Sequence, residues 1–158
     1  MAHDVARARR GVEVDRLALD QLDPHLIGEE GVLVVADNDN DVCFLIECTG
    51  ITIHNIDMVH ELGESPCLHN CVVIWDCRDV LVEYCDLSGC GYIGVEVLGN
   101  GDPANIRVEY CAIHDCEEGF YDVPGNTIKM KGNVLWDNGI PYWDPTGWNE
   151  GEMFGSER

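Results

Sequence analysis

Apolar side chains in the middle of the chain recur at intervals of two and three residues. Between positions 80 and 90 they fall at Val80, Val82, Cys85, Leu87 and Cys90. An interval of two is that of a β-strand that keeps one face inward, and an interval of three fits a sharp bend that returns the chain to that face. A helix would show intervals of three and four without the twos. The pattern therefore predicts short strands joined by bends.

Four similar segments carry this rhythm along the chain. They begin at Ile51, Val80, Ile106 and Ile128, so successive starts lie 29, 26 and 22 residues apart (80 − 51, 106 − 80, 128 − 106). Short constant blocks separated by insertions of variable length are typical of a solenoid in which each coil stacks on the previous one. We therefore expect an all-β solenoid of about four to five coils, with its inward positions stacked in columns.

The repeats "NIRVEYCAIHDC" and "NTIKMKGNVLWDN" resemble those of the right-handed parallel β-helix of the pectate-lyase-like superfamily. The resemblance covers residues 31–139. The segment from "SPCLHNC" to "CGYIGV" is also similar to cysteine-rich bacterial β-helix repeat proteins of unassigned activity. The resemblance implies the fold, and it transfers no catalytic residue because no lyase or hydrolase signature matches position by position.

A solenoid needs covered ends, so we expect a capping segment on each side of the β-helix. Residues 1–30 are the predicted N-terminal cap, and the leucines around Leu22 suit either a short amphipathic helix or an irregular strand. Residues 140–158 are the predicted C-terminal cap or tail. Their aromatic side chains either pack on the last coil, which we favour, or bind carbohydrate by stacking on sugar rings, and a truncated further coil is a third interpretation. The candidate sugar-stacking residues are Tyr142, Trp143 and Trp148.

Cysteines occupy matching inward positions of successive coils. A small, weakly polar thiol fills a tight bend well, so we interpret these cysteines as core residues. Disulfides between coils are an alternative, because strands spaced by ~4.8 Å bring Cα atoms within bridging range. A metal site is a further alternative, although zinc needs ligands that converge on a point. The columns pair Cys48 with Cys77, Cys85 with Cys111 and Cys90 with Cys116, and Asn133 and Asn138 end the last two.

Residues 60–71 form an excursion from the regular path and contain ligand types that zinc uses. His60, Cys67, His69 and Cys71 could form a zinc site, but a loop anchored by buried thiols is the interpretation we favour, with Cys71 packed inward.

The segment "DNDND" places Asp37, Asp39 and Asp41 at alternate positions, as at the start of a calcium-binding loop. An EF-hand loop would need glycine and glutamate where this chain has Val42 and Cys48. We therefore expect a polar turn and no cofactor, with Ca²⁺ bound by these carboxylates as the weaker alternative.

One outward strand face gathers most of the polar chemistry. If Val80 and Val82 point inward, charged side chains of four coils line up outside, and Glu83 and Glu109 lie about 5 Å apart. That separation suits a retaining glycoside hydrolase, whereas ordinary cross-strand ion pairs, which we favour, need no function. His114 beside Asp115 and near Asp137 is a second and weaker candidate. The candidate catalytic residues are His54, Glu83, Arg107, Glu109, Lys129 and Lys131.

The charge balance narrows the choice of partners. The chain has 30 acidic and 9 basic residues, for a formal charge of −21, so it should repel nucleic acid and anionic membranes. We expect neither as a partner, and we expect a glycan or self-association through the solenoid ends instead. Without a secretory signal the expected location is the cytoplasm, or the outside of the cell if the chain is part of a longer precursor.

These observations lead to two functional hypotheses. The first is a non-catalytic β-helix scaffold or carbohydrate-binding module, either alone or as part of a larger protein. The alternative is a carbohydrate-active enzyme, either a polysaccharide lyase or a glycoside hydrolase, that uses the outer strand face. A lyase would need a cation and a base, and the negative charge opposes a polyanionic substrate.

Overall fold

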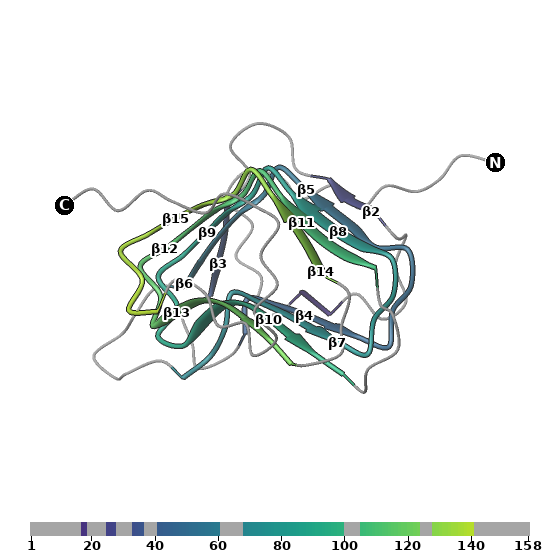
Figure 1. The fold of residues 1–158 in the computed structure, drawn as a ribbon, viewed down its shortest axis with the longest axis horizontal. Coiled ribbons are helices and arrows are strands. Elements are labelled where there is room, and N and C mark those ends of the chain that lie inside the picture. The colour runs from purple at the N-terminus through teal and green to yellow at the C-terminus, as the bar shows by residue number, and fades with distance from the viewer. Residues whose placement is uncertain are drawn as a thin grey trace.

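The computed structural model describes residues 17–18, 25–27, 33–36, 41–60, 68–99, 105–123 and 128–140. Among these residues every regular element is a β-strand, and no helix occurs that could cross a membrane. The strands form three parallel sheets that enclose one core, and each sheet is one side of a roughly triangular coil (Figure 1). The all-β parallel solenoid expected from the sequence is confirmed.

Each sheet contains five strands, one from each pass of the chain. Sheet 1 consists of β1 (Leu17–Ala18), β4 (Cys43–Ile46), β7 (Val72–Trp75), β10 (Ile93–Leu98) and β13 (Glu118–Asp122). Sheet 2 consists of β2 (His25–Ile27), β5 (Thr52–His54), β8 (Val80–Glu83), β11 (Ile106–Glu109) and β14 (Ile128–Lys131). Sheet 3 consists of β3 (Leu33–Ala36), β6 (Asp57–His60), β9 (Asp86–Ser88), β12 (Ala112–His114) and β15 (Val134–Trp136).

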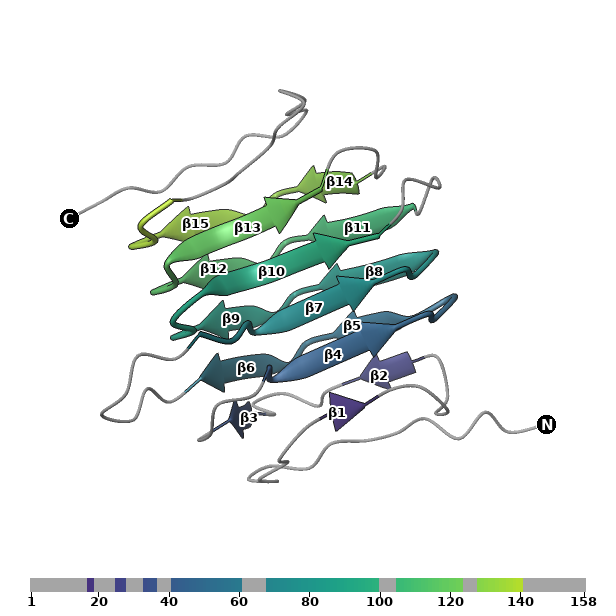
Figure 2. The same cartoon turned by 90° about the horizontal axis from the view of Figure 1, so that it is seen from below.

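The coils stack in chain order, from β1 at one end to β15 at the other (Figure 2). The repeated segments keep the register that the sequence predicts: Val80 of β8 pairs with Ile106 of β11, which pairs with Ile128 of β14. Within the segment expected to cap the N-terminus, β1 and β2 pair in parallel with β4 and β5. The described residues of that segment are therefore strands, and they continue the sheets.

Residues with a left-handed backbone conformation lie at the bends. In the steps of three, the residue directly before an inward position has positive φ, as Tyr84 does before Cys85 (φ 54°). This conformation turns the chain sharply, and Gly, Asn and Asp tolerate it best. These corner residues are Glu47, Gly50, Asn55, Asp76, Asp79, Tyr84, Gly89, Gly99, Asn105, Tyr110, Asp115, Gly132 and Asp137. They explain how a period of three returns the chain to the inward face.

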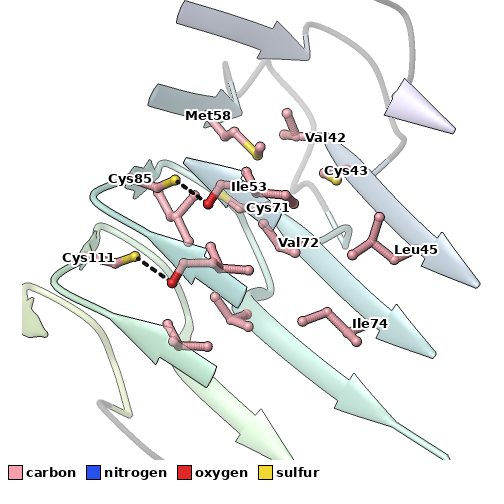
Figure 3. Packing of buried hydrophobic residues seen from close by; sticks show 14 of the residues in the cluster. Val42, Cys43, Leu45, Ile53, Met58, Cys71, Val72, Ile74, Cys85 and Cys111 are labelled. Carbon is pink, nitrogen blue, oxygen red and sulfur yellow. Dashed lines mark hydrogen bonds between the residues drawn. The ribbon is translucent and has the colours of Figure 1, made fainter. Parts of the chain in front are cut away.

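The core inside the three sheets consists of Val, Ile, Leu, Phe and Met side chains together with thiols. Figure 3 shows part of this core, including Leu45, Met58 and Cys43. Eight cysteines lie within the described residues, and all are buried free thiols. The inward columns predicted from the sequence are confirmed, since Cys48, Cys77, Cys85, Cys90, Cys111 and Cys116 all belong to the buried core.

Candidate functional site

The outer face of sheet 2 carries two columns of outward residues in the predicted register. His54 of β5 lies opposite Glu83 of β8, Glu83 lies opposite Glu109 of β11, and Glu109 lies opposite Lys131 of β14. The second column runs from Thr52 through Leu81 and Arg107 to Lys129. The structure therefore brings together all six residues that the sequence suggested as catalytic.

Each of the two glutamates on this face has a cationic or ionisable partner. His54 Nδ1 lies 3.1 Å from Glu83 Oε1, and Arg107 Nη1 lies 3.7 Å from Glu109 Oε1. All four side chains are partly exposed, so each pair stabilises the fold by well under 1 kcal/mol. The face resembles a set of ordinary cross-strand pairs more than a site that holds an unpaired acid.

Two tyrosines stand at the corner between sheets 2 and 3, next to this polar face. The rings of Tyr84 and Tyr110 stack at 5.1 Å with an interplanar angle of 12°. His54 of the preceding coil meets Tyr84 edge-on at 5.5 Å, and Lys131 Nζ of the following coil lies 5.4 Å from the centroid of Tyr110. The hydrogen bond with Tyr110 raises the pKa of Lys131. Each tyrosine therefore has a neighbour on both sides along the coil axis, although both side chains remain exposed to solvent.

His114 on the outside of sheet 3 contacts two carboxylates and one aromatic ring. Its Nε2 lies 2.9 Å from Asp86 Oδ1, and its Nδ1 lies 2.6 Å from Asp115 Oδ2. The imidazole stacks on Trp136 at 4.0 Å. The carboxylate from another coil that bonds to His114 belongs to Asp86, in the preceding coil. The sequence had suggested Asp137, in the following coil. Among the described residues no side-chain nucleophile is bonded to the ring, so the arrangement fits a pair of structural hydrogen bonds.

Asp41 is the described member of the predicted calcium-binding set, and Asp37 and Asp39 lie outside the described residues. Asp41 Oδ1 accepts a hydrogen bond from the backbone N–H of Asn70 at 2.8 Å. The buried Asn70 side chain in turn donates from Nδ2 to Glu96 Oε2 at 2.7 Å. Burial raises the pKa of Glu96, and this hydrogen bond opposes the rise. Asp41 thus helps to hold the start of β7, as expected of a residue in a polar turn.

The corner thiols satisfy backbone groups within the core. Each donates to the carbonyl two residues earlier, at Sγ–O distances of 3.1–3.4 Å; these thiols are Cys48, Cys77, Cys85, Cys111 and Cys116. The backbone N–H of Cys48 also donates to the Sγ of Cys77 in the next coil, at 3.4 Å. Burial raises the pKa of Cys77 to about 11, which keeps that thiol protonated at neutral pH.

Asparagine replaces the thiol where two of these columns end. Asn133 Oδ1 accepts from the Cys111 N–H at 2.8 Å, and its Nδ2 donates to the carbonyl of Val108 at 2.8 Å. Asn138 makes the same pair of bonds, to the N–H of Cys116 and the carbonyl of Ile113, at 3.0 and 2.9 Å. An amide side chain therefore has the same donor and acceptor roles as the thiols in the earlier coils.

Three thiols converge at one point of the core. The Sγ atoms of Cys71, Cys90 and Cys116 all lie within 4.8 Å of one another, and all three residues are buried. Hydrogen bonds with Cys71 and Cys90 lower the pKa of Cys116, and hydrogen bonds with Cys116 and Cys90 raise the pKa of Cys71. The sequence predicted the column of Cys90 and Cys116 and an inward Cys71, but it did not predict that Cys71 joins them.

Several predicted residues lie outside the part of the chain that the structure describes. These are Cys67 of the zinc hypothesis and the aromatic residues Tyr142, Trp143 and Trp148 of the sugar-stacking hypothesis. Of the other zinc candidates, His69 Nδ1 lies 3.7 Å from Asp41 Oδ1, and Cys71 points inward and donates to the carbonyl of Ser88 at 3.4 Å.

Comparison with known proteins agrees with this architecture. The sequence model of a family described as a right-handed β-helix region matches residues 31–147. No curated protein and no solved structure matches the chain significantly.

Proposed function

Because this chain belongs to the right-handed β-helix family, we propose that it is a non-catalytic scaffold whose sheet 2 face binds a neutral glycan. The observation that carries this proposal is the pairing of both glutamates on that face, His54 with Glu83 and Arg107 with Glu109. A general acid or a nucleophile needs a carboxylate that is available to the substrate. Both carboxylates are already engaged, whereas paired charged groups still offer donors and acceptors to sugar hydroxyls.

Electrostatics and ring geometry support an uncharged ligand. The formal charge of −21 opposes a polyanionic chain, so an uncharged glycan is preferred. Tyr84 and Tyr110 stack on each other and are flanked by His54 and Lys131. Recognition would therefore depend on hydrogen bonds from Arg107, Lys131 and the tyrosine hydroxyls rather than on stacking.

Titration of neutral and acidic oligosaccharides, followed by calorimetry and by an assay for released reducing ends, tests this proposal. We expect the wild type to bind a neutral glycan without cleaving it. Replacement of Glu83→Gln together with Glu109→Gln should loosen the ion pairs and raise the Kd at least fivefold. The exposed Glu117→Gln, away from sheet 2, is the matched control and should leave the Kd unchanged. Equal binding by the double variant and the wild type would contradict the proposed surface.

A carbohydrate-active enzyme is the second candidate, and one observation favours it. Glu83 and Glu109 occupy directly paired positions of neighbouring strands, next to Arg107 and Lys129, and two carboxyl groups about 5 Å apart suit a retaining glycosidase. Turnover that the wild type shows and the double variant loses would favour this enzyme and contradict the scaffold.

A further inference from the structure

The cluster of Cys71, Cys90 and Cys116 combines three separate parts of the coil. Cys71 lies directly before β7 in sheet 1, Cys90 follows β9 in sheet 3, and Cys116 lies between β12 and β13. The three Sγ atoms lie within 4.8 Å of one another inside the core, and the residues are 0%, 1% and 5% exposed. The parallel stacking alone would give only the column of Cys90 and Cys116, so the convergence depends on Cys71.

Gly94 lies beside the point at which the third thiol meets the other two. Val72 pairs with Val95, so Cys71 and Gly94 occupy equivalent positions of neighbouring strands, and Gly119 is the equivalent residue in the next coil. A Cβ atom at Gly94 would lie 2.5 Å from the carbonyl oxygen of Gly119 and 3.4 Å from the Sγ of Cys116. A side chain at Gly94 would therefore clash with the backbone of the next coil and would touch the sulfur of Cys116.

We propose that Cys71, Cys90 and Cys116 form a three-thiolate site for a soft monovalent cation, Cu(I). Thiolate sulfur is a soft ligand that favours Cu(I), zinc and iron–sulfur clusters among biological metals. Zinc prefers four ligands, whereas the described residues offer this cluster three thiols and no histidine or carboxylate as a fourth. Binding would exchange three S–H bonds for three S–Cu bonds and release three protons to the buffer, with no change of oxidation state.

The other thiols of the core provide matched controls. Cys111 is equally buried and lies in the neighbouring column, but it is followed there by Asn133, which bonds to its N–H. Replacing Cys111→Ser should therefore leave the proposed site intact while making a comparable change to the core. Cys67→Ser is a second control, for a thiol outside the described residues.

The test supplies Cu(I) anaerobically to the fully reduced chain, in competition with a chromophoric Cu(I) chelator, and measures stoichiometry and affinity. We expect one tightly bound ion per chain for the wild type, Cys111→Ser and Cys67→Ser. Cys116→Ser and Cys90→Ser should each lower the affinity at least tenfold, with circular dichroism to show that the fold is retained.

X-ray absorption of the wild type loaded with one Cu(I) needs no variant, so it tests the proposal even if a serine variant fails to fold. Three sulfur neighbours at one distance are expected. Two sulfurs, or a nitrogen neighbour, would overturn the site. It would also be overturned if Cys116→Ser bound Cu(I) like the wild type, or if the reduced wild type did not compete with the chelator.

Discussion

At the scale of the single residue, Asn133 shows what an inward corner position requires. Its amide accepts from the N–H of Cys111 and donates to the carbonyl of Val108, and the residue is 4% exposed. In the coils before it, a thiol fills the same position and donates to the same type of carbonyl, Cys111 to Val82 at 3.6 Å (Figure 3). The thiol, a weak hydrogen-bond donor, is sufficient in the earlier coils. The last coil has the stronger amide donor of Asn133 at the same position.

Replacing Asn133→Ala should therefore destabilise the protein more than any exposed substitution nearby. The change leaves a buried N–H and a buried C=O without their partners, and we expect a loss of about 3 kcal/mol in the free energy of unfolding, measured by urea denaturation. The neighbouring Val134→Thr is the control, because Val134 is 44% exposed and both residues are β-branched; it should change stability by less than about 0.5 kcal/mol. Similar losses for the two variants would refute this account of Asn133.

At the scale of the element, the corners decide where one strand ends and the next begins. Asn55, Tyr84, Tyr110 and Gly132 follow one another along the corner between sheets 2 and 3, and all have positive φ. Asn and Gly are expected in this conformation, whereas the tyrosines adopt it at a conformational cost. The stacking of Tyr84 on Tyr110 offsets part of that cost.

At this corner we expect the usual stability order to be reversed, so that a glycine variant is more stable than an alanine variant. Tyr110→Ala loses the stacking and keeps the positive φ, whereas Tyr110→Gly loses the same contact and relieves the backbone. We expect the glycine variant to be more stable by about 0.5–1 kcal/mol. At Thr52, the first residue of β5, whose φ is not positive, alanine should instead be the more stable of the two. Thermal or urea unfolding of the four variants gives both comparisons, and the same order at both positions would contradict the argument.

A second prediction at this scale concerns two aspartates that face each other across sheet 3. Asp57 of β6 and Asp86 of β9 are directly paired, and burial and the charge of Asp86 raise the pKa of Asp57. Replacement by Asp57→Asn keeps an oxygen acceptor and removes the like-charge pair. We expect a gain of about 0.5 kcal/mol at pH 7 and low salt.

The pH dependence of the same pair has a definite sign. A carboxyl group whose pKa is higher in the folded state binds its proton more readily there, so this group makes the folded state more stable as the pH falls through that pKa. Urea titrations between pH 7 and pH 4 should therefore show a gain in the wild type that is smaller in Asp57→Asn. A gain that is equal in both proteins would exclude Asp57 as its source.

At the scale of the element, most features of the fold could be predicted from the sequence, but the thiol cluster could not. The intervals of two and three were sufficient to predict the strands, the thiol columns and the register of Glu83 with Glu109. Each of these features depends on the spacing of residues within a repeat and on the match between successive repeats. The convergence of Cys71 with Cys90 and Cys116 was not predicted. It depends on how sheets 1 and 3 meet across the core and on the space beside Gly94, neither of which is a local property of the sequence.

At the scale of the whole molecule, the negative net charge destabilises the folded state. With a formal charge of −21 the folded chain repels itself, and salt screens that repulsion over a Debye length of about 10 Å at 0.1 M and about 3 Å at 1 M. We expect the midpoint of thermal unfolding to rise with sodium chloride and to level off below about 1 M. Sodium perchlorate at low, equal ionic strength should give a similar rise, because screening does not depend on the identity of the anion. A midpoint that stays constant in both salts would contradict this account.

The burial of so many cysteines also determines whether unfolding is reversible. Inside the coil the eight described thiols are buried, yet unfolding would expose all eight to solvent at once. Random crosslinks between such freed groups would block the return to the native state. Melting under argon with a reductant should consequently be reversible, whereas the same melt in air should be a one-way process.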